Sequence, residues 1–354
     1  MITTKQTGQW ARFCLRLLLP CLLAGGGLAG CTEEVPVANQ EQGQPVMMSI
    51  GSRAINADKP GEGIRMLRIL LVNPNNIDQT VVCNRFVNNP TDNPLKIQVV
   101  SGTYDVYVVA NESFGSRENN DLKNVRNLAD LKKIRRTFEP SEITMENNNI
   151  PMFGIVKNVN IIAPEGEPSE SNLAKITVNG SDNGTILPVS LTRLLCKINV
   201  TLKYSSGTPK NVCIENLPYF ITLFDETENT YGNNNETPRF LSTSVTDDPL
   251  YPNMTEVEDM LLPCWAFTPK DNIEKAPILM VTMKEGSETR LYRSVIGHAA
   301  GSSDNPKDYT LWRNYDYKLT AIITNNTVSV GASVTKWKDE TLSLEGGDPA
   351  TPTP

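Results

Sequence analysis

The sequence predicts an all-β protein made of two β-sandwich domains, with one short helix in the first. Three observations lead to this fold class: many short apolar segments of alternating polarity, abundant turn residues between them, and a single segment with helical spacing. A chain of 354 residues is long enough for two such domains. We place the boundary near Pro188, with domains at 54–188 and 189–354, a signal segment at 1–31 and a tether at 32–53.

The first 31 residues have the features of a secretory signal. Basic residues precede a short apolar stretch, Leu17 to Leu23, and small residues follow it. The stretch is shorter than the roughly 20 residues that cross a bilayer. The segment ends in Leu28-Ala29-Gly30-Cys31, which resembles the lipobox of bacterial lipoproteins, where the cysteine takes a diacylglyceryl group and becomes the mature N-terminus. The alternative is an ordinary secretory signal followed by a chance cysteine.

The tether that follows Cys31 is polar, apart from a short apolar run between Val46 and Ile50. Such a composition cannot bury enough surface to fold by itself. Glu33 and Glu34 resemble a surface-export signal that lipoproteins of some Gram-negative anaerobes carry after the lipidated cysteine, although a solvated linker would also contain acids.

Three strands are predicted at the start of the first domain. Ile64 to Val72 is strongly apolar and ends at a turn cluster, and its mixed periodicity predicts that both of its faces are covered. Leu95 to Val99 alternates as a strand with one exposed face does, and Gly102 to Asn111 repeats the pattern.

One helix is predicted from Leu122 through Ile134, with Asp121 as its N-cap. Five apolar residues in it follow helical spacing: Leu122, Val125, Leu128, Leu131 and Ile134.

Strands resume in the second domain with Leu194 to Leu202, which alternates from Cys196 onward. The later strand candidates are Val212 to Ile214, Tyr219 to Phe224, Ile278 to Met283, Leu291 to Ile296, Tyr315 to Thr324 and Val328 to Val334. A long polar insertion, Glu226 to Pro252, lies between them. Loops of that length are uncommon in compact domains unless they are functional or mobile.

Composition and motifs exclude several functions. The net charge of −7 and pI near 5.1 argue against a nucleic-acid partner, because phosphates require a positive surface. There is one histidine, His298, and we find none of the common catalytic motifs, although two carboxylates could still converge from distant positions. We therefore predict no enzyme and no cofactor.

The cysteines outside the signal do not predict a metal site. Cys83, Cys196, Cys213 and Cys264 are widely spaced and include no Cys-x-x-Cys pair, so no zinc cluster is expected. Since two of them lie in strand-like apolar runs, we expect buried thiols. One or two disulfides stay open as the alternative in an oxidising compartment.

Several segments together resemble the fimbrillins, the type V pilin family of Gram-negative anaerobes. After the lipobox and the opening strand at Ile64, the matching segments are a Gly-x-Tyr-x-x-Tyr-x-x-Ala-Asn strand from Gly102 to Asn111, a Pro-Met-x-Gly segment at Pro151, an Arg-x-x-Ala-Lys-Val strand at Arg193 and an Arg-Asn-x-x-Tyr start at Arg313. Cys196 stands where the family has alanine. The resemblance implies Greek-key, transthyretin-like sandwiches.

The resemblance also implies a route of assembly. In the family, an arginine-specific protease removes the N-terminal segment of an exported lipoprotein, and a terminal strand of the next subunit fills the groove left behind. The bond most like the family's cut site here joins Arg53 to Ala54. It follows the apolar run from Val46 to Ile50, which the resemblance suggests is the strand removed on maturation. Arg53 could also be an ordinary linker arginine.

The donor strand is expected near the C-terminus. Two alternating apolar runs lie there, one made of Val328, Val330, Ala332 and Val334 and a shorter one made of Leu342 and Leu344. A Pro- and Thr-containing tail follows, which cannot continue a sheet ladder. Because the second run is short, a stalk subunit, an anchor and a tip adhesin all stay open.

The resulting hypothesis is a structural pilin at the cell surface. It would be an outer-membrane lipoprotein before maturation and part of a fimbria afterwards, with other fimbrial subunits as partners and host or bacterial surface receptors as further candidates. The alternative is a lipid-anchored glycan-binding lipoprotein. That function needs exposed aromatic side chains on loops, and the long insertion offers only Tyr231 and Tyr251.

Overall fold

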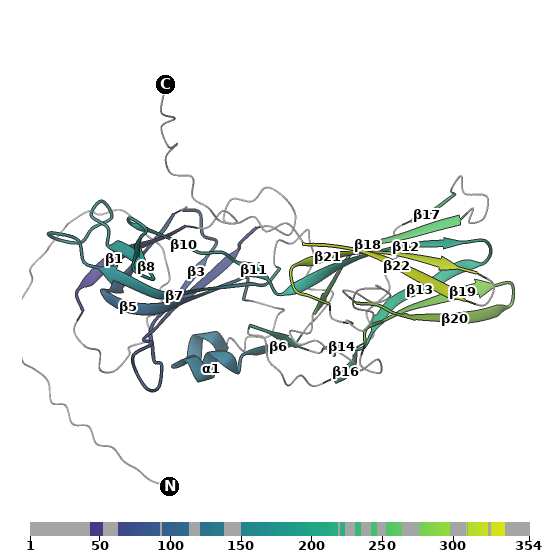
Figure 1. The fold of residues 1–354 in the computed structure, drawn as a ribbon, viewed down its shortest axis with the longest axis horizontal. Helices are drawn as coiled ribbons and strands as arrows, with labels where there is room; N and C mark the ends of the chain where they lie inside the picture. Colours follow the sequence, from purple (N-terminus) through teal and green to yellow (C-terminus); the bar gives the residue numbers. More distant parts are fainter. Residues whose placement is uncertain are drawn as a thin grey trace, which may run out of the picture. The chain divides into compact units, whose positions relative to one another are not determined.

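The computed structural model describes residues 43–51, 63–92, 94–112, 121–137, 150–218, 220–223, 231–234, 242–245, 253–263, 276–297, 309, 311–324 and 327–336. Strands dominate these residues and form two sets of packed sheets (Figure 1). The all-β prediction is confirmed, and α1, Leu128–Lys132, is the only α-helix among the residues described. In that part of the chain, no helix is long and apolar enough to cross a membrane.

The first set consists of a seven-stranded and a three-stranded sheet. The larger sheet has the order β3-β2-β5-β7-β8-β9 with β11 paired to β7, and the smaller has the order β10-β1-β4. The strand bounds are β1 Pro45–Gly51, β2 Met66–Val72, β3 Val81–Asn88, β4 Leu95–Val100, β5 Gly102–Ala110, β7 Met152–Ile162, β8 Lys175–Val178, β9 Ser181–Asp182, β10 Ile186–Pro188 and β11 Thr192–Arg193.

Buried side chains from both sheets meet in one core, so this set is a sandwich. Because side chains alternate along a strand, every second residue of β1, β2, β4 and β5 faces that core. These residues are Val46, Met48 and Ile50 from β1, Leu67, Ile69 and Leu71 from β2, Leu95, Ile97 and Val99 from β4, and Val106 and Val108 from β5.

The other face of the seven-stranded sheet is covered as well. Leu70 and Val72 of β2 are fully buried in a separate cluster with residues of the helical segment, which confirms that both faces of this strand are covered. The helix itself is shorter than predicted. A 3₁₀ turn, Asp121–Asn124, precedes α1, and the N-cap is Asn127, whose Oδ1 accepts a hydrogen bond from Asp130 N (2.8 Å), rather than Asp121.

The second set consists of a five-stranded sheet of order β17-β18-β12-β21-β22 and a three-stranded sheet of order β13-β19-β20. Alternate residues of both sheets form its core, among them Ile198, Val200 and Leu202 of β12. The strand bounds are β12 Leu195–Tyr204, β13 Thr208–Glu215, β17 Ser242–Val245, β18 Asn253–Pro263, β19 Ile278–Glu285, β20 Glu288–Val295, β21 Tyr315–Ile323 and β22 Val328–Lys336.

Four short strands form two small ribbons. β6, Arg135–Thr137, pairs with β15, Phe220–Thr222, and β14, Leu217–Pro218, pairs with β16, Tyr231–Asn234. The insertion predicted as a loop therefore contains two short strands, β16 and β17. The predicted strand at Tyr219 to Phe224 corresponds to β15, which covers only Phe220–Thr222.

Candidate functional site

Residues 45–51, predicted to be part of a tether, instead form a central strand of the three-stranded sheet. β1 runs antiparallel to β4, from Pro45 opposite Val100 to Ile50 opposite Leu95, and parallel to β10, from Ser49 to Gly51. On the edge away from β4, Ala174 N donates to Met47 O at 2.8 Å. We call the position bounded by β4, β10 and Ala174 the β1 slot.

The inner face of β1 completes the core of the first sandwich. Val46, Met48 and Ile50 are 1%, 0% and 1% exposed. Burying each such side chain stabilises the fold by about 1.5–3 kcal/mol. Because neither neighbouring strand is adjacent to β1 in the sequence, the slot is built by the rest of the sandwich, and β1 fills it.

The outer face of β1 is closed at its centre. Ser49 is fully buried, and its hydroxyl has no hydrogen-bond partner among the described residues. Lys96 of β4 lies directly opposite, on the same face of the sheet. Lys96 Nζ donates to Glu170 O at 3.1 Å and lies 3.9 Å from Glu170 Oε2, in the segment that leads to Ala174 on the far edge. The Lys96 side chain therefore lies on the outer face beside Ser49, and its contact with Glu170 joins β4 to the segment that leads to Ala174.

The chain beyond β1 is firmly held from Gly63 onward by Asn111. This residue is 2% exposed and has a left-handed backbone, with φ of 55°. Its Oδ1 accepts from Arg65 N at 2.8 Å, and its Nδ2 donates to Gly63 O at 3.1 Å and Ile150 O at 2.9 Å. The predicted cut site, Arg53 and Ala54, lies outside the described residues, between β1 and this anchor.

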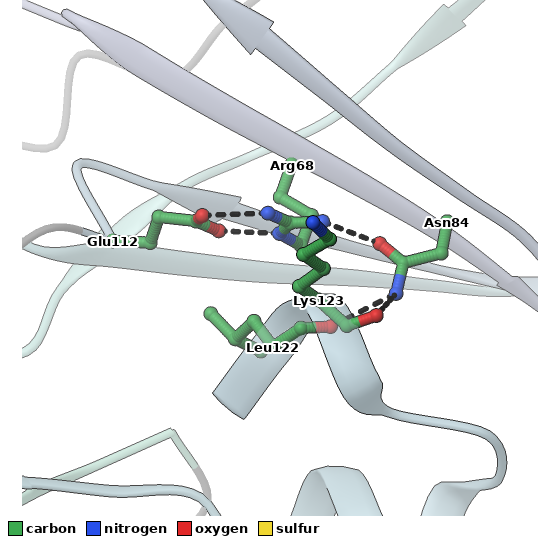
Figure 2. A network of polar contacts seen from close by, with 5 residues as sticks. All are labelled: Arg68, Asn84, Glu112, Leu122 and Lys123. Carbon is green, nitrogen blue, oxygen red and sulfur yellow. Dashed lines mark hydrogen bonds and ion pairs between the residues drawn. The ribbon is translucent and has the colours of Figure 1, made fainter. Parts of the chain in front are cut away.

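A buried ion pair continues the anchor into β2 (Figure 2). Arg68 donates from Nε and Nη2 to the two carboxylate oxygens of Glu112, at 2.5 and 2.7 Å, and from Nη1 to Asn84 Oδ1 at 2.7 Å. Asn84 Nδ2 in turn donates to Leu122 O at 2.9 Å. Arg68 and Glu112 are 4% and 3% exposed, so the pair lies in a low-dielectric environment where losing one partner is costly.

The predicted donor residues divide between two regions. Val328, Val330, Ala332 and Val334 belong to β22, an edge strand whose ladder partner is β21. Val328, Val330 and Val334 pack, partly buried, against the core of the second sandwich, while Ala332 is exposed. Leu342 and Leu344 lie outside the described residues, as does the predicted lipidation site Cys31.

Asn111→Asp tests the anchor. The substitution keeps the shape of the side chain but removes the donors to Gly63 O and Ile150 O, and an unpaired buried oxygen costs about 1–3 kcal/mol. We expect the free energy of unfolding, measured in denaturant, to fall by about 2–4 kcal/mol. Asn179→Asp is the matched control, because Asn179 has a similar φ of 50° but is exposed, and it should change stability little. Equal effects at both positions would contradict an anchoring role.

Residues 48–193 match the family model of the major fimbrial subunit protein, FimA. Residues 48–193 therefore belong to the fimbrillin family. The match begins inside β1 and ends at β11, so it spans the first sandwich with its β1 slot, and it confirms the family predicted from the sequence.

Two solved structures share the fold of this chain. The tip fimbrial protein Mfa3 from Porphyromonas gingivalis, with a C-terminal truncation, is 14% identical, with a TM-score of 0.54 over 83% of this chain and 100% of that one. A candidate cell adhesion protein from Parabacteroides distasonis is 13% identical, with a TM-score of 0.51 over 83% and 98% of the two chains. No curated protein matches the chain. The chain thus has the fold of a fimbrial protein and of a cell adhesion protein.

The fimbrillin motif residues serve packing and anchoring. Tyr107 is buried, and burial, together with the nearby charge of Asp105, raises its pKa to about 12. Burial likewise raises the pKa of Tyr104. Arg193 is buried and donates to Asn314 Oδ1 at 3.2 Å, while Lys197 forms an ion pair with Asp316 at 3.0 Å.

The cysteines and the histidine considered in the sequence analysis are partly covered by the structure. Cys196 and Cys213 are buried in strands and Cys83 is half-buried, while Cys264 and His298 lie outside the described residues. No cluster of metal-binding side chains occurs within the described ranges. Sequence reasoning missed Ser49, Lys96 and Glu112, because their roles depend on strands far apart in the chain. The Asn that ends the Gly-x-Tyr motif, Asn111, was the one available signal.

Proposed function

We propose that this fimbrillin is a structural subunit of a cell-surface fimbria that polymerises by strand exchange. In this proposal it is exported as a lipoprotein through Cys31, loses its N-terminal segment by cleavage after Arg53, and accepts a strand of another subunit in the emptied β1 slot. The observation that carries the proposal is β1 itself, a buried strand that completes the sandwich core and precedes the anchor at Gly63.

An empty β1 slot would demand a new strand. Removing β1 would expose the apolar side chains of the core around Val46, Met48 and Ile50, together with the N–H and C=O groups of β4 and β10 that now pair with it. An extended peptide satisfies both requirements, since its main chain continues the sheet and its alternate side chains fill the core. A head-to-tail contact of this kind does not close on itself and therefore builds a filament.

The arginines near β1 differ in their suitability as cut sites. A protease needs an extended stretch of main chain that it can bind. The Arg65 main chain is held by Asn111 and by Asn89, whose N–H donates to Arg65 O at 2.6 Å, and the Arg68 side chain is buried in its ion pair with Glu112. These contacts favour Arg53 as the cut site. After the cut, the hydrogen bonds of Asn111 would keep the chain from Gly63 onward in place.

The donor would come from the C-terminal region of another subunit. Among the described strands, β22 is an edge strand that pairs with β21 alone, so its release breaks that single row of main-chain hydrogen bonds. Its apolar residues Val328, Val330, Ala332 and Val334 have the same alternate spacing as the inner face of β1. The run at Leu342 and Leu344 is the competing donor. Before maturation the lipid on Cys31 would hold the subunit at the outer membrane; after assembly, the fibre would present it to host or bacterial surface receptors.

The proposal is tested by the N-terminal sequence and intact mass of protein recovered from the cell surface. We expect a start at Ala54 without lipid, in fractions that contain polymers. A start at a lipidated Cys31 in those fractions would identify an anchor or another surface lipoprotein and would overturn the polymerising stalk assignment.

A further inference from the structure

β22 contains a glycine that its own sheet does not require. Gly331 lies in the middle of the strand, opposite Thr320 of β21. A Cβ added to Gly331 would meet no atom within 4 Å, and its φ lies outside the left-handed region that favours glycine. Glycine inside a strand costs about 0.5–1 kcal/mol relative to alanine, and it often marks a place where another chain approaches closely.

The β1 slot requires a small residue at the centre of its outer face, which matches the glycine of β22. Beside Lys96 on the outer face, the position of Ser49 is fully buried, and the next outward position, Gly51, is buried as well. β1 thus carries small residues on its outer face where the slot is closed and large apolar residues on its inner face. The Ser49 hydroxyl, which has no hydrogen-bond partner in the described part of the chain, costs about 1–3 kcal/mol.

We propose that the β22 strand of a second copy enters the slot with Gly331 at the position of Ser49. This inference rests on the proposed function and adds the register of the exchanged strand. In this register, Val330 and Ala332 take the places of Met48 and Ile50, and the outer positions receive only Ser329, Gly331 and Ser333. Small apolar residues flank Gly331 on both sides, and serines follow them in both directions. The register therefore holds whether the strand runs parallel or antiparallel to the original β1.

Other registers fit less well. A shift by two residues can still fill all three inner positions with apolar side chains. The buried position of Gly51 is then taken by Thr335 in a parallel strand or by Thr327 in an antiparallel strand. The Gly331 register also removes the unpaired hydroxyl that Ser49 places there. It therefore explains both the mid-strand glycine and the small residues Ser49 and Gly51 at the buried outer positions of β1.

The test uses Gly331→Val in the chain that begins at Thr32, cut with an arginine-specific protease. Because a Cβ at 331 meets open space, the uncut variant should have at least the wild-type Tm. After cleavage we expect its polymer yield, measured by size distribution, to fall at least tenfold. Thr335→Val is the matched control, since residue 335 projects to the same side of β22 but lies beyond the closed positions, and it should polymerise normally. Lys96→Ala opens the outer face and should restore polymers of the Gly331→Val chain.

Each outcome decides one part of the inference. Equal polymer yields for Gly331→Val and Thr335→Val would overturn the register and leave strand exchange standing. Loss without rescue by Lys96→Ala would also overturn it, because closure by Lys96 is the reason for the small residue. If the wild-type chain loses β1, as judged by its mass, and still stays monomeric, the proposed function itself fails.

Discussion

Arg53→Lys should leave the subunit uncut, monomeric and fully folded. An arginine-specific protease recognises the guanidinium group, which lysine lacks. Arg53 lies two residues beyond the end of β1, so the substitution leaves the buried strand unchanged. With Val46, Met48 and Ile50 still in the core, the slot stays filled and no donor can enter. We expect more than a tenfold loss of polymer at unchanged Tm, measured by intact mass and size distribution of the surface protein.

The matched control is Arg65→Lys. Arg65 is exposed, but Asn111 and Asn89 hold its main chain, so this substitution should leave both the cut and the polymers normal. A normal start at Ala54 in the Arg53→Lys variant would show that the protease does not read this arginine. Polymers that keep β1 would show that exchange does not need the slot.

The sequence predicted best those strands whose pattern is local. Gly102 to Ala110 forms β5, and Leu195 to Tyr204 forms β12, because alternation over eight or more residues is visible without knowledge of their neighbours. β3 was missed, since Cys83, Asn84 and Arg85 interrupt its apolar run and Asn84 has a role only through Arg68 and Leu122. The helix was too long in prediction because the buried Leu122 and Val125 belong to a 3₁₀ turn and its exit rather than to α1.

The candidate site shows the same limit more sharply. The apolar run from Val46 to Ile50 was recognised, and its removal was inferred from the family resemblance. Composition placed residues 45–51 in the tether, and neither composition nor the resemblance could indicate that β4 and β10 supply a slot for the run. The closure of that slot by Lys96 could not be predicted either, since it depends on Glu170, which is 74 positions away in the chain.

Two truncations should separate the competing donors. A chain that ends at Thr327 lacks both apolar runs, and a chain that ends at Lys336 keeps β22 but lacks Leu342 and Leu344. After cleavage at Arg53, we expect the shorter chain to give monomers only and the longer chain to polymerise. The shorter chain should also lose a modest amount of stability, because Val328, Val330 and Val334 are partly buried against the second core.

The ability of the shorter chain to accept a donor strand shows whether that chain is folded. Its β1 slot is unchanged, so after cleavage it should bind an intact subunit and end the growing filament. We therefore expect the mean polymer length to shorten as its share in a mixture rises. Monomers from the chain that ends at Lys336, with normal cleavage, would identify the run at Leu342 and Leu344 as the donor and exclude β22. Polymers from the chain that ends at Thr327 would exclude both, because no C-terminal strand would then be available to fill the slot.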